Sequence, residues 1–222
     1  LPLEIALIFE RGRVQNRGVS QTRRAAGLLV VGLQAGAIIG ALAAGRIFAA
    51  TGGDLRVTIA CPFDPAGIAM GASIACSGVC LTVVDKGGEP GDSWFAVDIS
   101  AESVGRTVPG RWAVGTRLNL EPAMKLGDEL GGHIVTGHVD GVAEITRIAP
   151  DGDSRRFSFV VARELAPYLA PKGSITVDGV SLTVNEVEDL ADGACRFGVN
   201  IIPHTAEVTT LGELQQGSQV NL

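Results

Sequence analysis

Residues 73–83 read SIACSGVCLTV, and residues 174–184 read SITVDGVSLTV. Seven of these eleven positions are identical at an offset of 101 residues. The correspondence continues at an offset of 102, where WFAVDI (94–99) matches RFGVNI (196–201) and GTRLNL (115–120) matches GSQVNL (217–222). Matches that keep their register over this length are typical of an internal repeat. The chain is therefore interpreted as a tandem duplication.

Each half has the pattern of short β-strands. Segments 55–60, 79–84, 94–99 and 117–120 are rich in β-branched and aromatic residues, and clusters of Gly, Pro and Asp separate them. The cluster DKGGEPG at 85–91 predicts a turn. About six strands in about 90 residues is typical of a small closed barrel. The prediction is an all-β protein with two tandem six-stranded Greek-key barrels at residues 33–122 and 134–222, joined by a linker at 123–133.

Composition excludes several classes of protein. With 46% hydrophobic and 19% charged residues, the chain is not intrinsically disordered. Lys and Arg number 18 against 24 Asp and Glu, so the net charge of −6 argues against nucleic-acid binding. The four cysteines and three histidines lack the spacing of a metal site, and we expect no metal. Phosphate-loop, nucleophile-elbow and dinucleotide motifs are not present in the sequence.

The N-terminal segment, residues 1–32, lies outside the repeat and is atypical. The run from 25 to 45 contains no charged residue and is long enough to span a bilayer. Three interpretations stay open: a membrane span, a signal peptide, or a stretch foreign to the fold.

The duplicated motif supplies the first candidate site residues. Cys80 and Ser181 are equivalent, and Thr82 and Thr183 follow two residues later. Residues two apart in a strand point to the same face, so each half presents a pair of polar side chains. Such pairs suit a ligand bound once per half, although Ser and Thr also decorate ordinary barrel strands. His138 lies in a glycine-rich segment and titrates near neutral pH.

Four motifs carry a resemblance to a known family: GASIACSGVCLTV (71–83), DELGGHIVTGHVDG (128–141), KGSITVDGVSLTV (172–184) and IIPHTAEVTTLGELQQGSQVNL (201–222). Over residues 53–222 the chain resembles the riboflavin synthases of the α-subunit type, and residues 1–32 have no counterpart there. The resemblance implies dismutation of two 6,7-dimethyl-8-ribityllumazine molecules to riboflavin and 5-amino-6-ribitylamino-pyrimidinedione, without a metal or redox cofactor. It also implies a cytoplasmic homotrimer with sites between subunits, and an association with lumazine synthase.

The resemblance also implies roles for individual residues. The expected catalytic residues are Cys80, His138, Ser181 and Thr183. The expected substrate-binding residues are Leu81, Thr82, Asp98, Ile99, Ser100, Ala101, Glu102, Ser103, Gly137, Val139, Lys172, Leu182, Ile202, Pro203, His204, Thr205, Ala206 and Glu207. The alternative function is a non-catalytic lumazine- or flavin-binding protein of the same fold.

Overall fold

A computed structural model describes residues 43–51 and 55–222 of the chain. The predictions for residues 1–32, and for most of the uncharged run at 25–45, lie outside this part. The last residues of that run, Ala43 to Gly45, begin a β-strand. No helix of the described residues has the length and apolar character needed to cross a bilayer.

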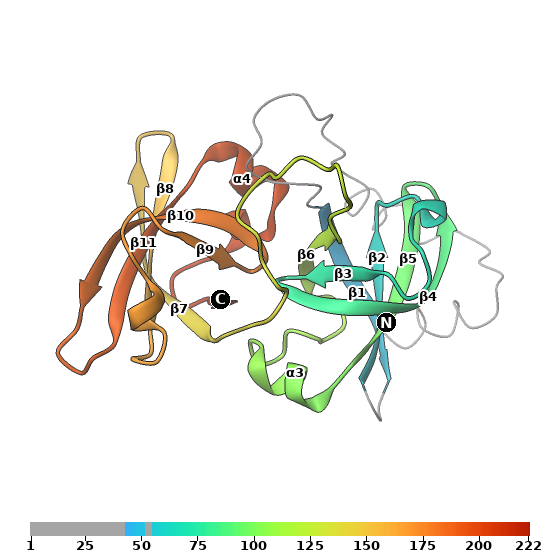
Figure 1. Ribbon diagram of the computed structural model, residues 1–222, viewed down its shortest axis with the longest axis horizontal. Coiled ribbons are helices and arrows are strands. Elements are labelled where there is room, and N and C mark those ends of the chain that lie inside the picture. The colour runs from blue at the N-terminus through green and yellow to red at the C-terminus, as the bar shows by residue number, and fades with distance from the viewer. Residues whose placement is uncertain (1–42, 52–54) are drawn as a thin grey trace.

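Strands dominate both halves of the molecule (Figure 1). The strands of the first repeat are β1 (Ala43–Thr51), β2 (Leu55–Cys61), β3 (Ser73–Cys76), β4 (Val79–Glu89), β5 (Asp92–Ile99) and β6 (Arg117–Pro122). Those of the second are β7 (Val142–Asp151), β8 (Ser154–Val161), β9 (Ser174–Val177), β10 (Val180–Asp189), β11 (Cys195–Ile201) and β12 (Gln219–Asn221). The short helices are η1 (Pro65–Gly67), α3 (Ala101–Arg106), η2 (Ala166–Tyr168), α4 (Pro203–Val208) and η3 (Thr210–Glu213).

The two repeats share one strand order, which confirms the all-β duplication. The first is a closed antiparallel barrel with the order β1-β2-β5-β4-β3-β6. The second has the order β12-β7-β8-β11-β10-β9, which is the same ring opened between β9 and β12. In the first barrel, Glu121 and Pro122 of β6 pair with β3. At the offset of 102 their counterparts would follow Leu222, and β12 pairs with β7 alone.

The alternation of the duplicated motif places its apolar residues inside. Val79, Leu81 and Val83 of β4 are buried, while Cys80 and Thr82 between them are exposed on the outer face. The β10 residues Val180, Leu182 and Val184 are buried in the same way. Each repeat has its own core, and in the second the rings of Phe159 and Phe197 stack with centroids 5.0 Å apart. Burial of such side chains, at roughly 1.5–3 kcal/mol each, stabilises both halves.

The predicted turn at 85–91 is wrong over most of its length. Strand β4 continues to Glu89, and β5 begins at Asp92. The register shifts between Val83 and Asp85, so a bulge bends the strand without ending it. A Cβ at Gly87 would lie 2.8 Å from the Trp94 ring, so the glycine makes room for a cross-strand aromatic side chain.

The repeats meet through two equivalent turns and two equivalent asparagines. Asn119 of the first repeat donates from Nδ2 to the Asp178 carbonyl (2.8 Å), and its Oδ1 accepts from the Thr210 amide (2.8 Å). Asn221 of the second repeat donates to the Ser77 carbonyl (3.0 Å) and accepts from the Val108 amide (2.9 Å). We call these four hydrogen bonds the asparagine exchange. It relates the repeats by an approximate two-fold axis.

Candidate functional site

The polar residues of the duplicated motif lie on the outer faces of the two sheets. On the second repeat, the strand register sets Ser181 opposite Thr176 and Thr183 opposite Ser174. These four residues, Ser174, Thr176, Ser181 and Thr183, form what we call the hydroxyl face. On the first repeat, Cys80 lies opposite Ala75 and Thr82 opposite Ser73. The second repeat therefore carries the more polar version of this surface.

His133, from the linker, sits on the hydroxyl face. Its Nδ1 is 2.7 Å from Ser181 Oγ, and its Nε2 is 3.1 Å from Thr176 Oγ1. The backbone amide of His133 also points at Ser181 Oγ, at 3.4 Å. Because that amide supplies a proton to the serine oxygen, the Ser181 hydroxyl is free to donate its own proton to Nδ1. The Nε2–H group then donates to Thr176.

Burial lowers the pKa of the His133 imidazole below its ordinary value near 6.5. The ring is therefore neutral at physiological pH, and it has a lone pair to accept a proton. A neutral imidazole bonded to a serine hydroxyl is an arrangement that general-base catalysis uses.

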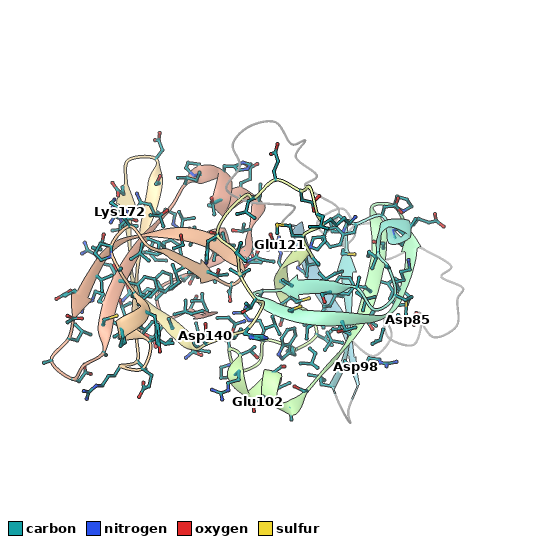
Figure 2. All side chains as sticks on the ribbon, in the orientation of Figure 1. Asp85, Asp98, Glu102, Glu121, Asp140 and Lys172 are labelled. Atoms are coloured by element: carbon teal, nitrogen blue, oxygen red, sulfur yellow. The ribbon has the colours of Figure 1, made fainter. Side chains whose placement is uncertain are left out.

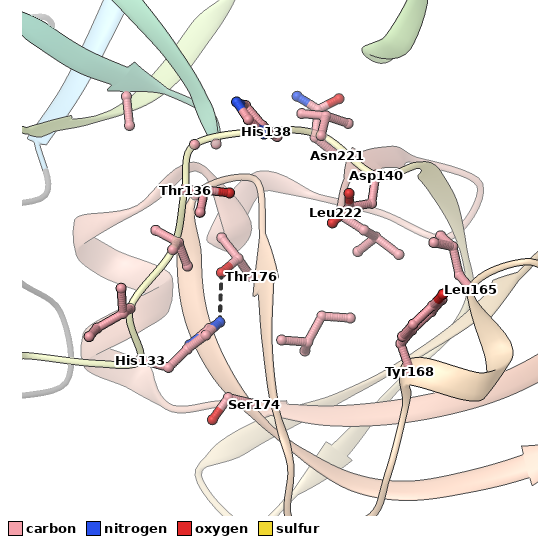
Figure 3. Close-up of a pocket in the computed structure, with 18 of the residues that line it drawn as sticks. His133, Thr136, His138, Asp140, Leu165, Tyr168, Ser174, Thr176, Asn221 and Leu222 are labelled. Carbon is pink, nitrogen blue, oxygen red and sulfur yellow. Dashed lines mark hydrogen bonds between the residues drawn. The ribbon is translucent and has the colours of Figure 1, made fainter.

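A cavity of about 310 Å³ opens beside His133, between the two repeats (Figure 3). His133 lies at one side of it and Tyr168 at the other, with His138 and Asn221 at the end near the first repeat. We call it the interface cavity. It is lined by Ala75, Gly78, Glu121, His133, Ile134, Val135, Thr136, Gly137, His138, Val139, Asp140, Leu165, Tyr168, Leu169, Ser174, Ile175, Thr176, Gly179, Asn221 and Leu222.

The lining combines apolar walls with a few polar groups. Leu165, Tyr168 and Leu169 provide an apolar side opposite the hydroxyls of Ser174 and Thr176. A mainly apolar pocket with a few placed polar groups is typical of a small-molecule site, and about 310 Å³ is near the lower end of such sites. The shape and chemistry suit one flat heterocycle that carries a hydroxylated chain.

Glu121 adds a carboxyl group to the same cavity from the first repeat. Burial raises the pKa of this carboxyl above its ordinary value. Among the described residues there is no cluster of three or more His, Cys, Asp or Glu side chains arranged to hold a metal ion.

The linker connects the two motif positions directly. While His133 contacts Ser181, the carbonyl of Gly137 accepts a hydrogen bond from the Cys80 amide at 2.8 Å. Gly137 has a φ of +76°, and a Cβ there would lie 2.4 Å from Cys80 Cβ. Both the backbone conformation and the close approach require glycine.

The structure separates the two histidines that the sequence presents. His138 lines the interface cavity together with Gly137 and Val139, but it is His133 that bonds to Ser181. Cys80 contacts the linker backbone and is exposed. Among the other predicted residues, Leu81, Ile99, Leu182 and Thr205 have buried side chains, so a ligand would reach them through the backbone alone.

The remaining predicted residues of the first repeat lie on the outer face of its barrel. Asp98 accepts two 2.7 Å hydrogen bonds from Arg56, and these bonds hold the pKa of the carboxyl below its usual range. Ser100 caps helix α3 by accepting from the Ser103 amide, and Glu102 pairs with Arg106. Ala101 is the first residue of that helix.

The corresponding residues of the second repeat lie elsewhere on the surface. Ile202 precedes helix α4, which contains Pro203, His204, Thr205, Ala206 and Glu207. Lys172 is exposed, and Figure 2 places it well away from Asp98 and Glu102. Within one chain, the predicted residues of the two repeats therefore do not come together. Figure 2 instead places Glu121 and Asp140 between the repeats.

Sequence reasoning missed His133, Thr176, Ser174 and Glu121. His133 stood inside a quoted motif, but the segment offered no reason to prefer it to His138. The alternation of β9 was the available signal for Ser174 and Thr176, since both lie on the face that carries Ser181 and Thr183.

Comparison with known proteins agrees with this geometry. The lumazine binding domain family matches residues 12–123 and again 136–222. Riboflavin synthase of Brucella abortus (strain 2308) is 48% identical over 171 residues, covering 76% of this chain and 80% of the relative. Riboflavin synthase of Mycobacterium bovis is 44% identical over 167 residues (75% and 81%), and that of Photobacterium phosphoreum is 40% identical over 183 residues (81% and 80%).

Among solved structures, LumP complexed with 6,7-dimethyl-8-(1'-D-ribityl) lumazine aligns with a TM-score of 0.65 at 24% identity, covering 83% of this chain and 96% of LumP. This likeness shows a shared fold. Two matches to one domain family, at the two repeats that the structure contains, and identities of 40–48% over most of the chain settle the family. The chain belongs to the riboflavin synthase family, whose members carry a duplicated lumazine binding domain.

Proposed function

We propose that this protein is a riboflavin synthase, which converts two 6,7-dimethyl-8-ribityllumazine molecules into riboflavin and 5-amino-6-ribitylamino-pyrimidinedione. A four-carbon unit passes from one lumazine to the other. The observation that carries the proposal is the contact of His133 with Ser181 and Thr176, at a cavity that both repeats line. The chain's 48% identity to a riboflavin synthase supports the same reaction.

The reaction needs a base and a way to polarise the heterocycle. The C7 methyl group of one lumazine is acidic and must lose a proton, and the other lumazine must be activated by nucleophilic addition. The neutral His133 imidazole and the Ser181 hydroxyl are the proposed proton-transfer pair. His138, Thr183 and Cys80 stay as further catalytic candidates, with the Cys80 thiol as nucleophile or base.

The two substrates must also be held face to face. The interface cavity has room for one ribityllumazine, so the second lumazine belongs on another surface. The exposed Cys80 and Thr82 on the first repeat are the equivalent polar pair. In the proposed assembly, a homotrimer, the first repeat of one subunit meets the second repeat of its neighbour. Such preorganisation contributes on the order of 7–11 kcal/mol to the barrier reduction.

Other parts of the proposal rest on the resemblance. Residues 33–122 and 134–222 are the two lumazine-holding units, with 123–133 as the linker, and the family matches at 12–123 and 136–222 support this division. The predicted substrate-binding residues around helices α3 and α4 are proposed contacts for the ribityl chains and rings. A cytoplasmic location and an association with lumazine synthase stay predictions.

The direct test mixes the purified full chain with 6,7-dimethyl-8-ribityllumazine alone and follows riboflavin by absorbance and fluorescence. Stoichiometric formation of riboflavin and the pyrimidinedione is expected. Ser181→Ala and His133→Gln should each lower the turnover at least tenfold, whereas Ser154→Ala, a matched change on β8, should not. A wild-type rate in both site variants would refute the assigned pair.

The test also separates the enzyme from its alternative, a non-catalytic lumazine- or flavin-binding protein. An enzyme binds two lumazines per chain and consumes them. A carrier binds lumazine or riboflavin without turnover, with one ligand per chain by equilibrium titration. Binding with no riboflavin formed, in fully folded protein, would favour the alternative.

A further inference from the structure

The asparagine exchange is symmetric, but the interface contains one contact that is not. Arg111 of the first repeat donates from Nη2 to Asp178 Oδ1 of the second repeat, at 2.7 Å. The Asp178 side chain is fully buried and that of Arg111 is 9% exposed. This is a salt bridge between the repeats in the interior of the protein.

The duplication supplies no second copy of this pair. At the offsets of the repeat, Ser77 stands where Asp178 stands and Glu213 stands where Arg111 stands. Glu213 forms its ion pair with Arg117 instead. Ser77 accepts a hydrogen bond from the Asn119 amide at 3.2 Å, while Asp178 Oδ1 accepts one from the Asn221 amide at 2.8 Å. The backbone contact is therefore common to both repeats, and the charge is unique to one.

The pair is connected to the interface cavity by short paths. Asn221, which donates to Asp178, lines that cavity, as does Gly179, the next residue in the turn. Ser181 follows Asp178 by three residues on the strand that this turn begins. Gly78 and Gly179 also touch across the axis, where a Cβ on Gly179 would lie 2.9 Å from the Gly78 nitrogen. A shift of the turn would therefore move cavity groups from both repeats.

We propose that Arg111 is a positioning residue, which acts through Asp178 to set the placement of the second repeat against the first and hence the geometry of the interface cavity. Its guanidinium compensates a fully buried carboxylate through a single hydrogen bond. Among the described residues, Arg111 Nε and Asp178 Oδ2 have no hydrogen-bond partner, so each charge depends on the other. Loss of one partner leaves an uncompensated buried charge, which is far more costly than loss of both.

The effect on activity rests on the proposed function, and the experiment separates the two. Three variants are compared with the wild type: Arg111→Met, Asp178→Ser, and the double variant. Each single change should lower kcat at least tenfold with a smaller change in KM. The double variant should return kcat to within threefold of wild type, because a serine at 178 can accept the Asn221 amide as Ser77 accepts the Asn119 amide. Arg196→Met, which removes an exposed ion pair with Glu188, is the matched control and should change neither constant.

A second readout does not depend on turnover. The ring proton resonances of His133, assigned by comparison with His133→Gln, should shift in Arg111→Met and return in the double variant. Arg111→Lys, which keeps the charge, is the fallback if Arg111→Met does not fold, and it should shift the same resonances less. Unchanged resonances and an unchanged kcat in a folded Arg111 variant, or a double variant no better than the singles, would overturn the proposal. If the wild type forms no riboflavin, the proposed function fails, while the resonances still decide the positioning role.

Discussion

Replacing Gly137 by alanine tests the contact between the linker and the first repeat. The new Cβ would lie 2.4 Å from Cys80 Cβ and 3.2 Å from the Cys80 nitrogen. Carbon atoms in ordinary contact are about 3.5–4.0 Å apart, so the linker or strand β4 must move by about 1 Å. The positive φ of +76° adds a backbone cost of about 1 kcal/mol for any residue with a Cβ.

Gly127 provides the matched control for the backbone cost. It has a φ of +96°, but a Cβ there meets no atom within 4 Å. Gly127→Ala should therefore cost about 1 kcal/mol. Gly137→Ala should cost that amount plus about 1–3 kcal/mol for overpacking, and about 1 kcal/mol for weakening the hydrogen bond from the Cys80 amide. The expected difference between the two variants is about 2–4 kcal/mol.

The assay is chemical denaturation of both variants, combined with the rate of riboflavin formation. Cys80→Gly in the Gly137→Ala chain removes the nearest clashing atom and should recover part of the lost stability. If the linker relieves the clash by moving away, His133 moves with it and the rate falls. Equal stability and equal rates in the Gly127 and Gly137 variants would refute the close packing of the linker on Cys80.

Three further predictions follow from the described contacts. Asn119→Ala and Asn221→Ala should each destabilise the fold by about 2–4 kcal/mol in thermal or chemical unfolding, since each leaves two backbone groups of the other repeat unpaired; losses below 1 kcal/mol would contradict the asparagine exchange. Because burial lowers the pKa of His133, the unfolded chain binds a proton first as the pH falls, so stability should drop from about pH 7 toward pH 5. The difference in stability between wild type and His133→Gln, measured across this range, should show that drop, and a flat difference would contradict it. A thiol reagent should modify Cys80 rapidly in the native protein and the buried cysteines only on unfolding; fast reaction of several native thiols would contradict the burial of Cys61, Cys76 and Cys195.

Much of the fold could be predicted from the sequence. A strand alternates its side chains between two faces, so the pattern of G-V-x-L-T-V already indicates which residues enter the core and which stay outside. The repeat then assigns the same structure to a second segment. The turn predicted at 85–91 shows the limit, because the glycines there serve a bulge and the packing of Trp94 rather than a chain reversal.

The site could be predicted in part. The outward placement of Cys80, Thr82, Ser181 and Thr183 follows from the strand period, which is local. The partner of Ser181 does not, because His133 is 48 residues away and reaches it through the path of the linker.

The sequence by itself therefore determined the duplication, the strands and the polar pairs, since periodicity and internal identity are carried by residues close in the chain. Tertiary structure alone decided which histidine meets the serine, which carboxyl is buried at the cavity, and that Arg111 pairs with Asp178 across 67 residues. These contacts depend on how two folded sheets pack against each other, and no local pattern of residues encodes that arrangement.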